Sequence, residues 1–257
     1  MQLNYKVQGQ GPPIVILHGV FGTLDNWQTA AKALAERHTV YLVDNRNHGR
    51  SPHDEAFNYE VMSEDLLNFI QAQRLVQPVV MGHSMGGKVA MYYACRYQPE
   101  QFSKLIVVDI APKYYRPHHQ QILEGLRSID LATLANRQHA DEQLAPYVPE
   151  PDTRQFLLKN LYRTDAGTFG WRMNLPVLHD KIENIGEGLP THFRSDKPAL
   201  FIRGGKSNYI RDTDVPLIKE HFPNAVVETI DDAGHWVHAE RPAQLLEKVL
   251  TFIQQPG

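Results

Sequence analysis

The stretch Val79-Val80-Met81-Gly82-His83-Ser84-Met85-Gly86-Gly87-Lys88-Val89-Ala90 decides the fold. An apolar run that is typical of a buried strand leads into the pattern G-x-S-x-G, and a helical pattern follows it. Between a strand and a helix, this pattern predicts a nucleophile elbow, a sharp turn in which the two flanking glycines leave room for a strained backbone. We therefore expect Ser84 to be a nucleophile, with His83 facing the sheet.

Composition favours one domain with a small-molecule partner. A chain of 257 residues can bury a substantial core and is commonly one α/β domain. The net charge of -3 gives no basic excess for binding nucleic acid or an anionic membrane. The N-terminus lacks a secretion-signal pattern, no stretch approaches about 18 apolar residues, and a lone Cys95 excludes an internal disulfide. We expect a cytoplasmic protein with no nucleic-acid or membrane partner.

Strand-like and helical patterns alternate on both sides of the elbow. Continuous apolar runs predict buried strands at 14–17, 79–82 and 105–108, further strands are predicted at 39–43, 199–203 and 225–230, and an edge strand is predicted at 3–7. Helices are predicted at 24–37, 59–74, 85–97, 215–222 and 242–253. This order predicts an α/β fold with a doubly wound, mostly parallel sheet, whose sites lie at the carboxyl ends of the strands.

The segment from Pro112 to Pro190 breaks this rhythm. It contains helical patches at 120–129, 131–147 and 153–162 but no strand-like apolar run. We expect residues 113–190 to form a helical cap inserted over the strand ends, and residues 1–112 and 191–257 to form the core.

A serine hydroxyl needs a neighbouring base, which an acid must orient. Among 13 histidines, His235 is favoured because it follows a predicted strand in a glycine-bearing loop and comes last in the chain. Asp109 ends the strand at 105–108, at the same sheet edge as Ser84. Neither His118-His119 nor the pair His235 and His238 has carboxylates at metal-ligand spacing, so packing or solvated roles are favoured for the others. We expect no metal and no cofactor.

Several stretches carry a family resemblance: HGVFG at 18–22, DNRNHGRS at 44–51, GHSMGG at 82–87 and DDAGHWVHAERP at 231–242. In them the chain resembles the α/β-hydrolase superfamily over essentially its whole length. Further stretches are similar to the bacterial YbfF-type esterases and related acyl-ester and thioester hydrolases, namely DNWQ at 25–28, VDIAP at 108–112, FGWRMNLPVL at 169–178 and GGKSNYI at 204–210. The resemblance implies the α/β-hydrolase fold.

The resemblance also bears on the acid. Most members of the superfamily carry an Asp in the loop after the strand that corresponds to 199–203, but here Ser207 occupies that slot and cannot carry a negative charge. The YbfF-like pattern instead takes the acid from the preceding strand, which implies Asp109, with Ser207 as an auxiliary hydrogen-bonding partner. Three other carboxylates remain alternatives: Asp212, Asp231 and Asp232.

Backbone N–H groups must stabilise the oxyanion, one of them from the residue after the nucleophile. We expect Met85 and, by resemblance to HG-x motifs, Val20, with Phe21 as the neighbouring alternative. The expected substrate-binding side chains are apolar: Phe21, Phe169, Trp171, Met173 and Trp236.

These residues favour a serine carboxylesterase that hydrolyses acyl esters, with acyl-CoA thioesters as a further substrate class, through an acyl-enzyme on Ser84. One alternative is a C–C bond hydrolase or lyase on the same scaffold. A second is a non-catalytic member of the fold that binds a ligand. The presence of Ser, Asp and His together favours an enzyme, and the YbfF-like VDIAP pattern favours ester chemistry.

Overall fold

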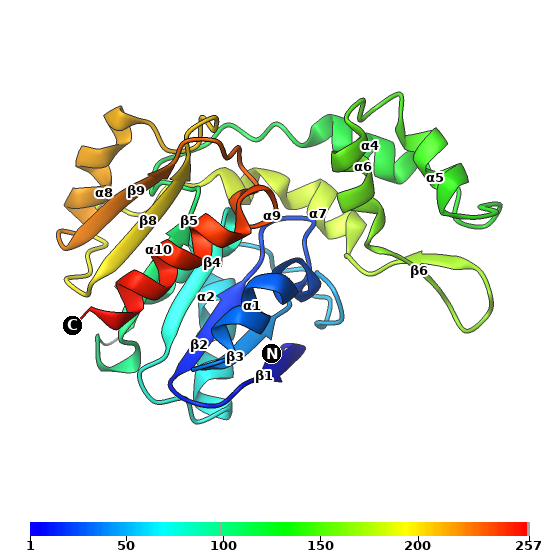
Figure 1. Cartoon of the computed structure of the whole chain (residues 1–257). Helices are drawn as coiled ribbons and strands as arrows, with labels where there is room; N and C mark the ends of the chain where they lie inside the picture. The colour runs from blue at the N-terminus through cyan, green and yellow to red at the C-terminus, as the bar shows by residue number, and fades with distance from the viewer. Residues whose placement is uncertain (98, 256–257) are drawn as a thin grey trace.

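The computed structural model describes residues 1–97 and 99–255 (Figure 1). Seven strands of these residues form one sheet in the order β1-β3-β2-β4-β5-β8-β9. Their bounds are β1 Tyr5–Gln8, β2 Pro13–Leu17, β3 Thr39–Val43, β4 Val79–His83, β5 Lys104–Val108, β8 Ala199–Gly204 and β9 Ala225–Ile230. Strand β1 is antiparallel to β3, and the other neighbours pair in parallel. The predicted doubly wound, mostly parallel sheet is confirmed.

Helices cover both faces of this sheet. One face packs against α2 (Tyr59–Ala72), α3 (Met85–Arg96) and α8 (Val215–His221), and the other packs against α1 (Gln28–Leu34) and α10 (Pro242–Gln254). Along β2, Val15 and Leu17 join the first cluster, whereas Ile14 and Ile16 join the second. Both faces of β2 are therefore buried, which is why this strand is a continuous apolar run in the sequence.

The predicted helix at 24–37 is divided. A short 3-10 helix spans Leu24–Trp27 and α1 follows it. The Leu24 N–H donates to Asp44 Oδ1 at 2.8 Å, and the Thr23 N–H donates to Asn26 Oδ1 at 2.7 Å. These two side-chain acceptors satisfy the N–H groups that begin the segment and anchor it to the loop after β3.

Between β5 and β8 the chain forms the segment expected as the cap, residues 113–190. Its elements are α4 (Gln120–Ser128), α5 (Arg137–Leu144), α6 (Pro151–Leu158), β6 (Leu161–Arg163), β7 (Phe169–Trp171), α7 (Leu175–Lys181) and a 3-10 helix (Ile182–Gly186). Figure 1 shows α4, α5, α6 and the β6 hairpin on one side of the sheet, beyond the strand ends. Helix α4 packs against α5 and α7, and α5 packs against α6.

Two details of this segment differ from the sequence prediction. Strands β6 and β7 form an antiparallel hairpin with Arg163 opposite Phe169, and strands of three residues are too short to show an alternating pattern. The helix expected at 131–147 begins only at Arg137, because the Asn136 side chain caps it by accepting the His139 N–H at 2.9 Å.

Lys88 on α3 holds both connections between core and cap. Its ammonium donates to the backbone oxygen of Lys113 at 2.7 Å, where the chain leaves the core, and to that of Glu187, where the chain returns. The side chain is fully buried, and burial lowers the pKa of Lys88 to about 7. The two connections are also joined directly, since the Tyr115 N–H donates to the Gly186 oxygen at 2.8 Å.

Within the residues that the structure describes, no helix combines the length and apolar character needed to cross a membrane.

Candidate active site

Ser84 lies on a strained turn between β4 and α3. Its backbone has φ 51° and ψ -120°, in the left-handed region that a non-glycine residue rarely adopts. A Cβ on Gly82 would lie 2.1 Å from the Gly86 oxygen, and a Cβ on Gly86 would lie 2.5 Å from the His18 oxygen. Both positions therefore require glycine, and the turn has the geometry of a nucleophile elbow.

Asp109 directly follows the neighbouring strand β5, and its side chain is fully buried. Its Oδ2 accepts a hydrogen bond from His235 Nδ1 at 2.8 Å, and its Oδ1 accepts one from the Gly204 N–H at 3.0 Å. His235 lies in the loop after β9, so loops from three strands meet here. A proton on Nδ1 leaves His235 Nε2 as the acceptor nitrogen, which is the tautomer that a general base requires.

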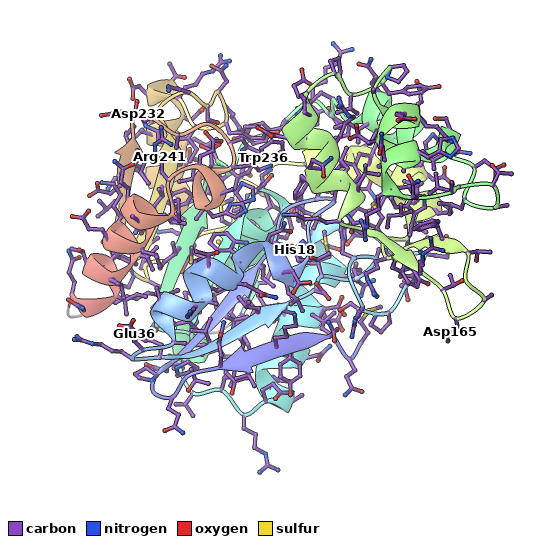
Figure 2. All side chains as sticks on the ribbon, turned by 45° about the vertical axis from the view of Figure 1, so that its right-hand side comes forward. His18, Glu36, Asp165, Asp232, Trp236 and Arg241 are labelled. Carbon is purple, nitrogen blue, oxygen red and sulfur yellow. The ribbon has the colours of Figure 1, made fainter. Side chains whose placement is uncertain are left out.

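The three alternative acids lie elsewhere. Asp212 forms an ion pair with Arg203 at 2.7 Å, and its side chain is 90% exposed. Asp232 lies 3.8 Å from Lys206, and Asp231 is also exposed. Figure 2 shows Asp232 on the outer surface. It is therefore Asp109 that the structure pairs with His235.

Ser207 contacts the same carboxylate. Its hydroxyl accepts from the Tyr209 N–H at 3.2 Å and donates to Asp109 Oδ2 at 2.5 Å. The Tyr209 ring stacks on the His235 ring, with centroids 3.8 Å apart and planes 15° from parallel. Burial raises the pKa of Tyr209 to about 12, so the ring stays neutral. Tyr209 is not among the site residues predicted from the sequence, although the quoted stretch GGKSNYI contains it two residues after Ser207.

The expectation that His83 faces away from the site is wrong. Its ring lies 4.7 Å from the His235 ring, and its Nε2–H donates to the His235 backbone oxygen at 2.9 Å. Strand alternation places His83 on the face of Met81 and Trp27, at the level where the His235 loop crosses. Burial holds the pKa of His83 well below its ordinary value, so this support is neutral.

The loop after β2 supplies a free N–H near Ser84. The Phe21 N–H donates to His48 Nε2 at 3.2 Å, and the Phe21 oxygen accepts from the Asn160 side chain of the cap at 2.7 Å. Burial lowers the pKa of His48 to about 3, which keeps Nε2 an acceptor. Among the described residues, the Val20 and Met85 N–H groups have no hydrogen-bond partner. The N–H of Phe21, the alternative donor, is thus occupied.

His18 supports the same loop through hydrogen bonds of both ring nitrogens. Its Nε2 accepts from the Asn45 N–H at 3.0 Å, and its Nδ1–H donates to the Gly19 oxygen at 2.7 Å. Burial lowers the pKa of His18, which favours this neutral form. His18 therefore joins the carboxyl ends of β2 and β3.

A cavity of about 120 Å³ lies between core and cap, and both Ser84 and His235 border it. Six apolar side chains form much of its wall: Phe21, Trp27, Ile122, Phe156, Leu157 and Trp236. Figure 2 shows Trp236 between the C-terminal part of the core and the cap helices, with His18 below it. Phe21 and Trp236 are thus at the cavity, as the sequence analysis expected.

The other three predicted substrate contacts lie away from Ser84. Phe169, Trp171 and Met173 do not border this cavity in the described part of the chain. Phe169 lies beside the Arg163 guanidinium, 4.5 Å from it, in the hairpin. Met173 is buried among apolar side chains, and Trp171 borders a separate surface depression. Phe169 and Trp171 belong to the β6–β7 hairpin, and Figure 2 shows the hairpin tip at Asp165 far from the centre. The cap reaches the cavity with α4 and α6 instead.

His118 and His119 also border the cavity, which sequence reasoning missed by favouring solvated or packing roles. The Tyr209 hydroxyl and His118 Nε2 share a hydrogen bond of 3.3 Å. Burial lowers the pKa of His119 to about 3. Throughout the described residues, His, Cys, Asp and Glu side chains form no group of three or more that could hold a metal ion.

Comparison with known proteins agrees with this geometry. The model of the alpha/beta hydrolase fold family matches residues 12–242. Esterase YbfF of Escherichia coli is 36% identical, over 98% of this chain and 99% of its own length. The sn-1-specific diacylglycerol lipase ABHD11 of Danio rerio is 37% identical, over 99% of this chain and 83% of its own length.

A solved structure of a marine microorganism esterase is 42% identical and superimposes with a TM-score of 0.95, covering 98% of this chain and 99% of that one. The elbow, the buried sheet and these full-length matches lead to one conclusion. The chain belongs to the α/β-hydrolase family and is homologous there to the YbfF and ABHD11 proteins.

Proposed function

We propose that this protein is a serine carboxylesterase with Ser84, His235 and Asp109 as its catalytic residues. One observation carries the proposal: His235, hydrogen-bonded to the buried Asp109 at 2.8 Å, borders the same apolar cavity as the elbow residue Ser84. The esterase and lipase names of the homologues support the same activity. Thioesters of coenzyme A are a second class of acyl donor for the same chemistry.

In the proposed reaction, His235 Nε2 takes the Ser84 hydroxyl proton while the Ser84 oxygen attacks the ester carbonyl carbon. The carbonyl oxygen becomes negative and accepts hydrogen bonds from the Val20 and Met85 N–H groups. The bond between carbon and alcohol oxygen then breaks, and His235 gives its proton to the leaving alcohol. Asp109 fixes the imidazole tautomer and stabilises the imidazolium.

Deacylation repeats these steps with water. His235 removes a proton from a water molecule, the resulting oxygen attacks the acyl carbon, and the Ser84 oxygen leaves as it regains the proton. The carboxylic acid is released. We assign the core to residues 1–112 and 191–257 and the cap to residues 113–190, whose helices α4 and α6 cover the cavity.

The test compares wild type with S84A. A fluorophosphonate should label the wild type at Ser84 and leave S84A unlabelled, and p-nitrophenyl acetate hydrolysis should fall to background. Ser84 is small and lies at a turn, so the thermal unfolding temperature should stay close to wild type. Labelling of S84A at the wild-type rate would refute the assignment, and hydrolysis that survives in S84A would exclude an acyl-enzyme on this residue.

A further inference from the structure

Two separate hollows meet at Ser84. The larger is the cavity of about 120 Å³ described above, and the smaller measures about 30 Å³. Five residues border both: Val20, Ser84, His118, His119 and Tyr209. When the Ser84 oxygen has attacked an ester, the carbonyl carbon carries the negative oxygen and two further substituents, the acyl chain and the alcohol oxygen. The two hollows therefore offer one space for each.

We propose that the smaller hollow binds the acyl chain and the larger one binds the alcohol. The substrates are then esters of short, uncharged acids with bulky apolar alcohols. This inference rests on the proposed esterase function and adds the substrate class to it.

The position of the general acid decides the direction. His235 must donate its proton to the oxygen of the leaving alcohol, so the alcohol must lie on the side of the serine that His235 borders. Of the described residues, His235 borders the larger hollow and not the smaller. Met85, whose N–H faces the developing oxyanion in the proposed mechanism, borders the smaller one. The acyl chain is thus directed away from His235, into the smaller hollow that Met85 borders.

The volume of the smaller hollow limits the acyl length. A site needs about 10–15 Å³ on this measure to hold one water molecule. A hollow of about 30 Å³ therefore holds two or three groups of that size. Since the carbonyl carbon stays at Ser84, the acyl chain has room for about two or three further carbons, which corresponds to propionyl or butyryl.

Hydrogen bonds fix the walls of the smaller hollow. The Tyr59 hydroxyl donates to the Ile185 oxygen at 2.7 Å. The Tyr115 hydroxyl accepts from the Ala111 N–H at 2.8 Å and donates to the Tyr209 oxygen at 2.5 Å. The Lys88 ammonium lies 5.6 Å and 5.2 Å from the centres of the Tyr59 and Tyr115 rings, behind the wall. A longer acyl chain would have to break these contacts.

The lining of each hollow matches the proposed substituent. Tyr59, Ile110 and Ile185 give part of the smaller hollow an apolar surface, and its polar lining residues include His118, His119 and Arg116, of which His118 and Arg116 are exposed to solvent. An uncharged acyl chain is therefore favoured over one that ends in a carboxylate. The larger hollow is walled by aromatic and aliphatic side chains of core and cap, which suits an apolar alcohol.

The test measures kcat/KM for 1-naphthyl esters from acetate to octanoate, with the alcohol held constant. Wild type should lose at least about tenfold between butyrate and octanoate. I185A enlarges the smaller hollow and should move the optimum about two carbons longer. I122A makes the same truncation in the larger hollow, so it should leave the acyl profile in place and reduce the preference for naphthyl over methyl esters. I185V serves if I185A does not fold.

Each other outcome is decisive. An acyl optimum shifted by I122A and unmoved by I185A would reverse the two sites and refute the proposal. A flat wild-type profile up to octanoate would refute the length limit, and faster hydrolysis of the succinyl than of the butyryl ester would refute the preference for uncharged acids. Failure of the underlying esterase function is distinguishable, because no ester would then be cleaved and no fluorophosphonate would label Ser84.

Discussion

Replacing Asp109 with asparagine should inactivate the protein by inverting the tautomer of His235. The Gly204 N–H donates to Asp109 Oδ1, so the asparagine oxygen must stay on that side to accept it. The amide nitrogen then replaces Oδ2 and points its N–H groups at His235 Nδ1 and Ser207. His235 Nδ1 must become an acceptor, which moves the ring proton to Nε2, the nitrogen that should accept the Ser84 proton. The fixed Gly204 N–H thus leaves the asparagine no favourable flip.

The magnitude follows from this tautomer and from the lost charge. The same substitution in a serine protease triad lowers kcat by about 10⁴-fold, or about 5 kcal/mol in activation free energy, and we expect a similar loss. S207A is the matched comparison because it removes a neutral contact to the same carboxylate. Asp109 would keep its charge and its bonds to Gly204 and His235, so kcat should fall by about tenfold or less, the scale of ~1.4 kcal/mol.

The assay is kcat for p-nitrophenyl acetate in wild type, D109N and S207A, with thermal unfolding to show that each variant folds. The expected order is wild type, then S207A, then D109N close to the S84A background. A nearly inactive S207A beside a nearly normal D109N would refute the reasoning. The acid would then lie elsewhere, and D212N, D231N and D232N would be the next variants to measure.

Two further predictions concern contacts between core and cap. K88M should alter the pH dependence of stability, because the folded lysine releases its proton above about pH 7 while the unfolded lysine keeps it up to 10.5. Between these values, the unfolding free energy of wild type, measured in urea, should rise by about 1.4 kcal/mol per pH unit relative to K88M. Parallel pH profiles of the two proteins would contradict the lowered pKa of the buried amine. N160A leaves the Phe21 oxygen without its 2.7 Å hydrogen bond, so it should cost about 1–3 kcal/mol of unfolding free energy and lower kcat. N184A removes a similar 2.8 Å hydrogen bond to the Phe57 oxygen and should affect stability alone. Equal losses of kcat in the two variants would refute a link between Asn160 and the oxyanion loop.

The positions of the strands were best predicted where both faces of a strand are buried. Strands β2, β4 and β5 lie within one residue of the predicted bounds, because both faces of these central strands are covered and the apolar run ends where burial ends. The elbow was predictable for a different reason. Gly82 and Gly86 meet backbone atoms at distances that no Cβ allows, so the turn leaves its pattern in the sequence itself.

The walls of the site were harder to predict because they come from segments far apart in the chain. Tyr209 and His119 are 90 positions apart in the numbering yet border both hollows, and nothing in the local pattern of either segment indicates the other. Phe169 and Met173 failed as substrate contacts for the same reason. Their apolar character predicts burial, which the structure confirms, but it does not specify whether the partner is a ligand or the rest of the cap.

Lys88 shows how the stretch that forms the elbow also fixes the position of the cap. It lies four residues after Ser84, one helical turn along α3, and the Lys88 N–H donates to the Ser84 oxygen at 3.1 Å. The helix that begins with the Met85 N–H therefore also carries the ammonium that holds Lys113 and Glu187. A lysine in the buried first turn of this helix has no local explanation, since its two acceptors lie 25 and 99 residues away. The conformation of the Lys88 side chain therefore depends on the cap. Lys88 also lies over the Tyr115 ring, and the Tyr115 hydroxyl donates to the backbone oxygen of Tyr209, whose ring stacks on His235.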